Sequence, residues 1–118
     1  TYKRKLMNDL SKKKCVPCEG GLDPFSEEKA LKFLNKIHND WSLSSDHKKI
    51  TREFKTNNHY ELMSFINMVA WISNTEDHHP QITFSYNTAV VEYFTYAIDG
   101  LSENDFICAS KIDNYFKN

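Results

Sequence analysis

The sequence has little net charge and no long apolar run. Its formal charge is −1 over 118 residues, which argues against a nucleic-acid-binding protein, because such proteins depend on basic side chains that neutralise phosphates. No apolar segment reaches the roughly 18 residues needed to cross a bilayer, and the first residues lack the apolar stretch of a signal peptide. We therefore expect a protein of the cytoplasm, with neither nucleic acid nor membrane as a partner.

Cysteine is also scarce, and three cysteines cannot form a complete disulfide framework. Cys15 and Cys18 have the spacing of half a zinc site, but no second CxxC or HxxxH supplies the remaining ligands. They also lie in an irregular segment, whereas redox pairs lie between a strand and a helix. Three interpretations stay open: an inert or structural role, a metal-linked arm, and a redox pair. Cys108 lies on the apolar face of a predicted helix, and we expect it in the core.

Three helices are predicted where a capping residue precedes an apolar periodic segment. Ser26 is the predicted N-cap of a helix that ends near Asn39. Asn58, followed three residues later by a glutamate, forms the capping-box pattern of a long helix that ends around Thr75. Ser102 begins the last helix with the same pattern.

Alternating apolar residues and short turns predict four strands. Residues 1–25 show little periodicity, so we expect an extended N-terminal arm there and a single domain over residues 26–118. Strands joined by short turns pair antiparallel, which predicts an α+β fold of two layers, a four-stranded antiparallel sheet with three helices on one face, in the order α-β-β-α-β-β-α. The strands are predicted at residues 41–43, 50–54, 82–86 and 90–96.

Two adjacent histidines, His78 and His79, separate the long helix from the third strand. The unperturbed imidazole titrates near physiological pH, so this pair can offer one proton donor and one acceptor to a small substrate. Pro80 forces His79 toward an extended backbone, and Asp77 can orient a ring. Neighbouring side chains diverge in extended backbone, which disfavours a shared metal ion. The alternative is a pair of solvated histidines in a polar turn, but we expect both rings to face a shared cleft.

The residues around the histidine pair resemble the pterin-4a-carbinolamine dehydratase family. The resemblance covers roughly residues 14 to 113, and it depends on the order and spacing of several motifs together. These motifs are KCVPCEGG over residues 14–21, Trp41, Phe54, FINxVA over residues 65–70, HHPQITFSYN over residues 78–87, Phe94-Thr95, and GLSxxD over residues 100–105.

This resemblance implies an activity as well as a fold with the same element order. The expected reaction removes water from a 4a-hydroxytetrahydropterin to give the quinonoid dihydropterin, as in tetrahydrobiopterin recycling, with no metal and no organic cofactor. His78 and His79 would be acid and base, with His79 as the base and His78 as the donor or pterin-orienting group. Assembly into a homodimer or homotetramer is also implied.

The sequence departs from the family pattern at Tyr96 and Asn74. Tyr96 stands where the family has a third histidine, and a phenol can donate a hydrogen bond but is a poor base at neutral pH. It either keeps an acid role or packs at a strand end. Asn74 stands where an acidic residue is common, and it can still bond to a pterin edge without charge.

Asp105 matches an acidic residue of the family, and two roles are open for it. It can orient an active-site side chain, or it can complete a capping box with Ser102. The predicted catalytic residues are therefore His78, His79, Tyr96 and Asp105, and the predicted substrate-binding residues are Asn74, Asp77, Pro80 and Thr95. The alternative function is a non-catalytic dimerisation or coactivator-type binding module on the same fold.

Overall fold

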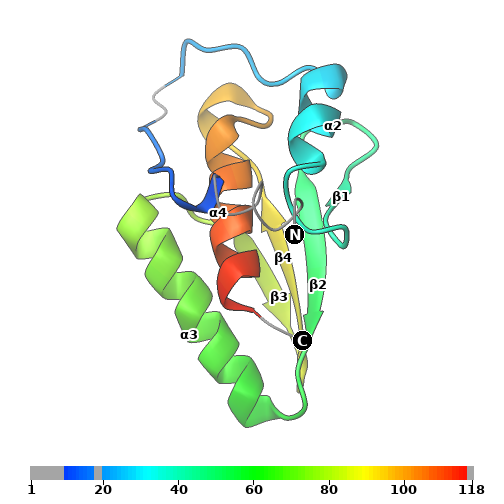
Figure 1. Ribbon diagram of the computed structural model, residues 1–118, viewed down its shortest axis with the longest axis vertical. Coiled ribbons are helices and arrows are strands. Elements are labelled where there is room, and N and C mark those ends of the chain that lie inside the picture. Colours follow the sequence, from blue (N-terminus) through cyan, green and yellow to red (C-terminus); the bar gives the residue numbers. More distant parts are fainter. Residues whose placement is uncertain (1–9, 18–19, 117–118) are drawn as a thin grey trace.

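The computed structural model describes residues 10–17 and 20–116 (Figure 1). From residue 26 onward the predicted element order is confirmed, with one short additional 3-10 helix before the last α-helix. The elements are α2 (Glu27–Leu34), β1 (Ser42–Leu43), β2 (Ile50–Lys55), α3 (His59–Glu76), β3 (Gln81–Phe84), β4 (Thr88–Tyr93), η1 (Tyr96–Ile98) and α4 (Glu103–Tyr115).

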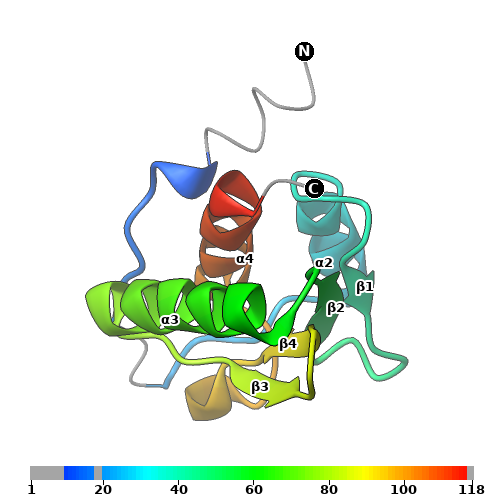
Figure 2. The ribbon, with the colours of Figure 1, turned by 90° about the horizontal axis from the view of Figure 1, so that it is seen from below.

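The four strands form one antiparallel sheet in the order β1-β2-β4-β3. Strands β2 and β4 pair in the middle over their full length, so the two short strands β1 and β3 form the edges. All three long helices lie over the same face of the sheet (Figure 2). This arrangement confirms the predicted two-layer α+β fold.

Capping side chains begin the helices where the sequence predicted. The Ser26 hydroxyl accepts a hydrogen bond from the Lys29 backbone N–H at 3.2 Å, and the Asn58 side chain accepts one from Glu61 N–H at 2.8 Å. However, α2 ends at Leu34 and not near Asn39. Ile37 caused the longer prediction, because it is buried in the core although it lies in a turn. Within the described residues, no helix is both long and apolar enough to span a membrane.

The fourth strand is shorter than predicted, which moves Tyr96 out of the sheet. β4 ends at Tyr93, and the chain closes a tight turn in which Thr95 N–H donates to Gly100 O at 2.9 Å. Inside this turn, residues 96–98 form the short helix η1. A side chain at Gly100 would place its Cβ only 2.5 Å from Pro24 Cβ. Glycine is therefore required where this turn packs against the arm.

The core lies between the sheet and the three helices. Alternate residues of the two central strands are buried, and Cys108 on α4 is fully buried, as predicted. A buried ion pair crosses this core, since the Arg52 guanidinium lies 2.6 Å from the Asp113 carboxylate and the Trp41 indole donates to the same carboxylate at 2.9 Å. The described part of the arm is not extended throughout, because residues 10–11 are helical and Leu10 is buried in the core.

Candidate active site

The end of α3 determines how the two histidines leave the helix. Asp77 caps α3 in the left-handed conformation, with φ 53° and ψ 44°, a region that aspartate tolerates better than most residues. The His78 backbone N–H then bonds to Ser73 O at 3.2 Å. This cap turns the chain from the helix toward β3, and His78 and His79 occupy the resulting connection.

The His78 side chain points into the protein, where it meets a buried carboxylate. Its Nε2 lies 2.6 Å from Asp105 Oδ1, and only 11% of the side chain is exposed. The ring also stacks on Tyr93, with centroids 5.7 Å apart and planes 4° apart. Because an ionised carboxylate only accepts hydrogen bonds, Nε2 carries the proton in this contact. Nδ1 is then the nitrogen left for another partner.

Asp105 is fully buried and is held by donors on both oxygens. Its second oxygen, Oδ2, accepts from the Thr95 hydroxyl at 2.6 Å and from the Ser102 backbone N–H at 2.9 Å. The bond to Ser102 is the capping-box contact at the start of α4. The carboxylate therefore makes both of the contacts that the sequence left as alternatives.

The Thr95 hydroxyl links Asp105 to Ser102. Thr95 Oγ1 lies 2.9 Å from Ser102 Oγ. Since the single Thr95 hydroxyl proton is donated to the carboxylate, Ser102 is the donor in this second contact. Ser102 thus donates to Thr95, and Thr95 donates to Asp105. Thr95 was predicted to bind substrate, but its hydroxyl is buried and bonds within the protein.

The other predicted site residues lie at the surface around this network. Tyr96 is 76% exposed, and its ring packs edge-on against Phe94 at a centroid distance of 4.6 Å. Its neighbour in sequence, Thr95, is the residue that holds Asp105. His79, Asn74 and Asp77 are exposed as well, and Pro80 is partly buried. The structure therefore brings together His78, Asp105 and Thr95, whereas His79, Tyr96, Asn74 and Asp77 face solvent.

Two members of the network, Tyr93 and Ser102, were not predicted as site residues. Tyr93 lies two residues before Thr95, so the period of a strand places both on one face near Asp105. That spacing is the signal that could have identified Tyr93. Ser102 was read only as a helix cap, although its side chain also bonds to Thr95.

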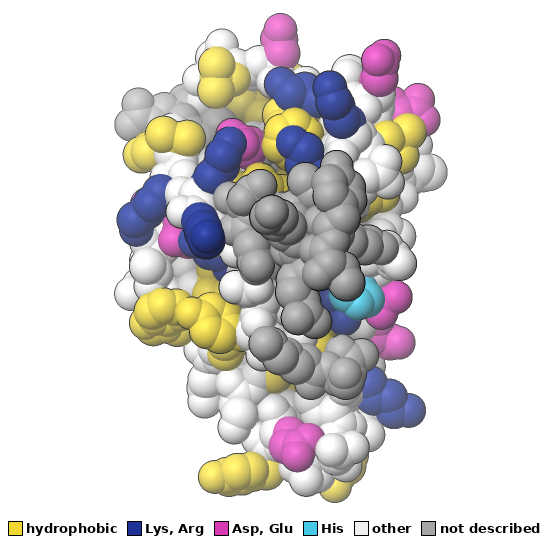
Figure 3. All heavy atoms as spheres, viewed as in Figure 1, with side chains coloured by type: hydrophobic (Ala, Val, Ile, Leu, Met, Phe, Trp, Pro, Cys, Tyr) yellow, Lys and Arg dark blue, Asp and Glu magenta, His cyan; other side chains and the backbone are white. Residues whose placement is uncertain are grey.

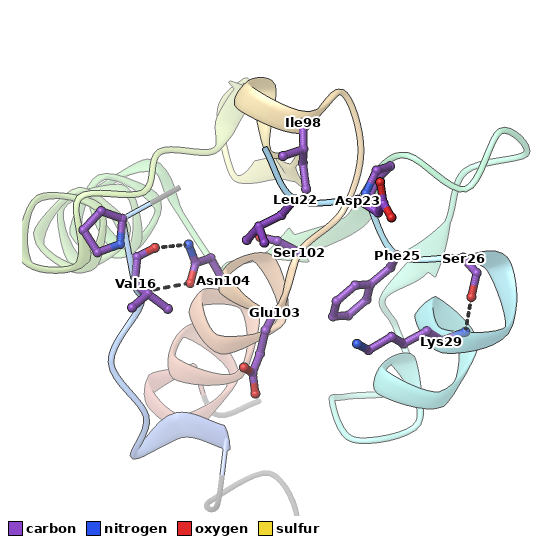
Figure 4. A pocket seen from close by; sticks show the side chains of 12 residues that line it. Val16, Leu22, Asp23, Phe25, Ser26, Lys29, Ile98, Ser102, Glu103 and Asn104 are labelled. Atoms are coloured by element: carbon purple, nitrogen blue, oxygen red, sulfur yellow. Dashed lines mark hydrogen bonds between the residues drawn. The ribbon is translucent and has the colours of Figure 1, made fainter. Parts of the chain in front are cut away.

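A cavity of about 520 Å³ lies between the arm, the start of α2 and the start of α4 (Figure 4). Its wall is largely apolar, with Leu22, Phe25 and Ile98, and it includes Ser102. A second cavity of about 430 Å³ has three lysines on its wall, Lys29 and Lys32 of α2 and Lys36 just after its end. Basic side chains gather on the upper half of the face seen in Figure 3. A third, of about 120 Å³, lies between α3 and α4. None of these three is lined by His78 or His79, so the expected shared cleft is not among them.

The cysteines do not form a metal site within the described residues. There, no group of three or more His, Cys, Asp or Glu side chains could hold a metal ion. The Cys15 and Cys108 sulfurs lie 3.6 Å apart as free thiols. Cys18 lies outside the described residues.

Comparison with known proteins gives consistent matches over most of the chain. The model of the family described as pterin 4 alpha carbinolamine dehydratase matches residues 23–115. A provisionally named pterin-4-alpha-carbinolamine dehydratase of Nitrosomonas europaea is 50% identical over 109 residues, 92% of this chain and 95% of the relative. A relative of Legionella pneumophila with the same name is 42% identical over 108 residues, 92% and 96% of the two chains.

A solved structure has the same fold. The crystal structure of a transcriptional coactivator/pterin dehydratase from Brucella melitensis superimposes with a TM-score of 0.73 and is 25% identical. The alignment covers 78% of this chain and 97% of that one. Almost all of the unmatched residues therefore belong to this chain.

Proposed function

Because the chain belongs to the pterin 4 alpha carbinolamine dehydratase family, we propose that it removes water from a 4a-hydroxytetrahydropterin to give the quinonoid dihydropterin. The observation that carries this proposal is the contact between His78 and the buried Asp105 at 2.6 Å. The His78 imidazole is fixed in place because it is almost buried, stacks on Tyr93 and bonds to a carboxylate whose two oxygens both accept hydrogen bonds. A fixed, ionisable ring next to a second histidine is what an acid–base dehydration requires.

The reaction needs one proton to arrive and one to leave. The bond between C4a and the hydroxyl oxygen breaks, the departing hydroxyl takes up a proton to become water, and the N5 proton goes to a base. We assign the donor role to His78: the Asp105 carboxylate holds one proton on Nε2 and stabilises a ring that carries a second proton on Nδ1. His79, which is exposed, is the proposed base, because it can return its proton to water after each turnover.

The remaining predicted residues are proposed to hold the pterin. Tyr96 can donate a hydrogen bond to the departing oxygen, and its place beside Thr95 keeps it next to the Asp105 network. Asn74 and Asp77 lie exposed within the last turn of α3 and at its cap, on the approach to the histidines. Their amide and carboxylate oxygens suit the amino and N–H donors of a pterin ring, and the partly buried Pro80, next to His79, is the proposed apolar contact for that ring.

Dehydration of a synthetic 4a-hydroxytetrahydropterin tests the proposed activity directly. The purified protein should increase the rate well above the spontaneous reaction, as followed by the absorbance of the quinonoid product. Tyr96→His is the informative variant, because it restores the histidine of the family pattern; it should match or exceed the wild-type rate. Spontaneous rates for both proteins would eliminate the catalytic proposal.

A homo-oligomer that pairs along β3 is part of the same proposal. β3 is an edge strand, and edge strands present unpaired backbone groups to another chain. Phe84 at the end of β3 and Tyr86 just after it are exposed, by 49% and 65%. Sedimentation should therefore give a multiple of the mass of one chain, and Phe84→Lys should shift the distribution toward the monomer. A wild-type protein that sediments as a monomer would contradict this part.

The second candidate function is a dimerisation or coactivator-type module without catalysis. Two observations favour it: the exposed Tyr96 in place of a histidine, and a structural relative that is itself named a transcriptional coactivator/pterin dehydratase. Calorimetric titration with a dihydropterin separates the two functions. Binding supports the enzyme, and no heat at high micromolar ligand supports the module.

We also propose that the protein acts in the cytoplasm. Its three cysteines cannot form a complete disulfide framework of the kind found in proteins of oxidising compartments.

A further inference from the structure

The arm residues around Cys15 are held firmly against α3 and α4. The Asn104 side chain makes two hydrogen bonds to the Val16 backbone, one from Val16 N–H at 3.0 Å and one to Val16 O at 2.7 Å (Figure 4). The Cys15 N–H donates to the Glu76 carboxylate at the end of α3, at 2.9 Å. Three hydrogen bonds to two different helices therefore fix the position of Cys15.

This anchoring brings two thiols together that are far apart in sequence. The Cys15 and Cys108 sulfurs lie 3.6 Å apart, and Cys15 Sγ also donates to Asn104 O at 3.7 Å. A thiol has a single proton, so if Cys15 donates to the carbonyl, Cys108 must donate to Cys15. The two sulfurs thus lie in contact with each other, and both are free thiols.

We propose that Cys15 and Cys108 form a reversible disulfide that locks the N-terminal arm onto α4. A disulfide has an S–S length of about 2.05 Å, so the two sulfurs, now 3.6 Å apart, need to approach by roughly 1.5 Å. The bond would close a loop between residues 93 positions apart, and a long loop gains the most stability from a cross-link in the chain-entropy account.

The two cysteines have different parts in the chemistry. Cys108 is fully buried, and its hydrogen bond to Cys15 together with burial raises the pKa of the Cys108 thiol. Cys15 is only partly buried, so it is the sulfur that an oxidant reaches first. The oxidant class is a hydroperoxide, such as hydrogen peroxide.

The oxidation then proceeds in two balanced steps. The Cys15 thiol gives up its proton, its sulfur attacks one peroxide oxygen, and the O–O bond breaks; Cys15 becomes a sulfenic acid, while the other oxygen leaves as hydroxide and takes up the thiol proton to become water. Cys108 sulfur next attacks Cys15 sulfur, the S–O bond breaks, and a second water leaves with the Cys108 proton. Two thiols and one hydrogen peroxide thus give one disulfide and two waters, and a dithiol reductant reverses the change.

The position of the cross-link connects it to the site described above. Cys108 follows Asp105 by three residues on α4, and positions three apart lie on the same side of a helix. Glu76, which holds the Cys15 N–H, precedes His78 by two residues. Oxidation would therefore tie the arm, the end of α3 and the start of α4 together behind the Asp105 network, without using any group that takes part in it.

Peptide mapping of the full chain after oxidation tests the proposal. Trypsin cleaves after lysine and produces one fragment of residues 15–29 and one of residues 56–111, which contain Cys15 and Cys108. The variant Cys18→Ser leaves only these two cysteines. After treatment with hydrogen peroxide and digestion without reductant, the two fragments should run as one cross-linked species that a reductant separates. The oxidised protein should also melt about 5 °C or more higher, and reduction should reverse this shift.

Matched variants separate the proposed pairing from its competitors. Cys15→Ser removes a partly buried thiol and should fold normally by circular dichroism, yet give no cross-link and no rise in Tm. Cys108→Ala should also give no cross-link, but it tests a buried position and is secondary. The proposal is overturned if Cys18→Ser gives no joined fragments, if wild type pairs Cys15 with Cys18 inside the fragment of residues 15–29, or if the cross-linked protein melts at the same temperature as the reduced one.

Discussion

His78 and His79 are neighbours in sequence but lie in opposite environments. His78 is almost buried, stacks on Tyr93 and meets Asp105 at 2.6 Å, whereas His79 is exposed. The carboxylate that holds His78 is itself held by Thr95 and Ser102. The fold therefore determines the orientation of one imidazole through three successive contacts and leaves the other to solvent and substrate.

This difference shows that two adjacent histidines can have different roles, one held by the core and one open to solvent. Substitutions of His78 or of the residues that hold it should affect stability and dehydration together, because the contacts that orient the ring also cap α4 and fill the core. Substitutions of His79 should affect dehydration alone. Measuring both quantities on the same variants separates the two sides.

The largest effect is expected at Asp105, where the His78 side is anchored. Asp105→Ala removes the partner of His78, of Thr95 and of the Ser102 N–H, and it leaves buried donors without an acceptor. The free energy of unfolding should fall by about 3 kcal/mol, and kcat/KM for dehydration by at least roughly 100-fold. Urea unfolding and the dehydration assay measure these changes. Asp105→Asn keeps the shape and should fall between Ala and wild type; wild-type stability in Asp105→Ala would contradict the network.

The paired variants His78→Ala and His79→Ala test whether the two histidines lie in different environments. His78→Ala should lower the free energy of unfolding by about 2 kcal/mol, since it opens space beside Tyr93 and leaves Asp105 with one donor fewer. His79→Ala should stay within about 0.5 kcal/mol of wild type, as exposed substitutions usually do. Both should lose dehydration activity. Equal losses of stability in the two variants would show that their environments do not differ as described.

A smaller effect is expected at Thr95, one contact further from the histidine. Thr95→Val keeps the shape of the side chain but removes the donor to Asp105 and the acceptor for Ser102. The free energy of unfolding should therefore fall by about 1–2 kcal/mol. Thr95→Ser keeps the hydroxyl and is the matched control, with most of the stability retained. If Val and Ser behave alike in urea unfolding, the hydroxyl does not hold the carboxylate.

Among the residues in contact with His78 and Asp105, the smallest change of stability is expected at Tyr93, and it has the opposite sign. Its buried hydroxyl oxygen has no hydrogen-bond partner of ordinary geometry among the described residues, and burial, followed by the neighbouring Cys108 thiol, raises the pKa of Tyr93 well above its ordinary value. Tyr93→Phe keeps the ring beneath His78 and removes this hydroxyl, so stability at neutral pH should rise by about 1 kcal/mol. A loss of stability in Tyr93→Phe would mean that the hydroxyl is bonded.

The pH dependence of the same pair of proteins gives a second check. A tyrosine with a raised folded pKa favours the folded state below its ordinary pKa of about 10, and this contribution disappears as pH rises through the folded value. Wild type should therefore lose stability above about pH 10 faster than Tyr93→Phe. Urea unfolding between neutral pH and pH 11 measures this difference, and parallel curves would contradict it.

Local signals predicted most of the fold, and the misses have physical causes. Ser26 and Asn58 cap their helices as predicted, because capping depends on residues within one turn. The strand that ends at Tyr93 was drawn too long, since the turn that stops it depends on Gly100 packing against Pro24 in the arm. Contacts of this kind join distant segments and leave no pattern within a short window of sequence.

In the candidate site, too, the sequence identified single residues but not the contacts between them. The histidine pair and Asp105 were identified from motifs, but the sequence did not show that Asp105 would hold His78 and cap α4 at the same time. The approach of Cys15 to Cys108 was out of reach as well, because it depends on where the Asn104 side chain anchors the arm. Long-range contacts decide which motif residues meet, and only the folded chain shows them.

The most direct test of the central claim is the single-turnover rate of dehydration in His78→Gln, measured with the variant in excess over a 4a-hydroxytetrahydropterin. Glutamine fills similar space and can still bond to Asp105, but it cannot deliver a proton. Because the variant lacks the proton donor, we expect a rate at least roughly 100-fold below that of wild type in a fully folded protein. A folded variant that reacts within about threefold of the wild-type rate would contradict the assignment of His78 as proton donor.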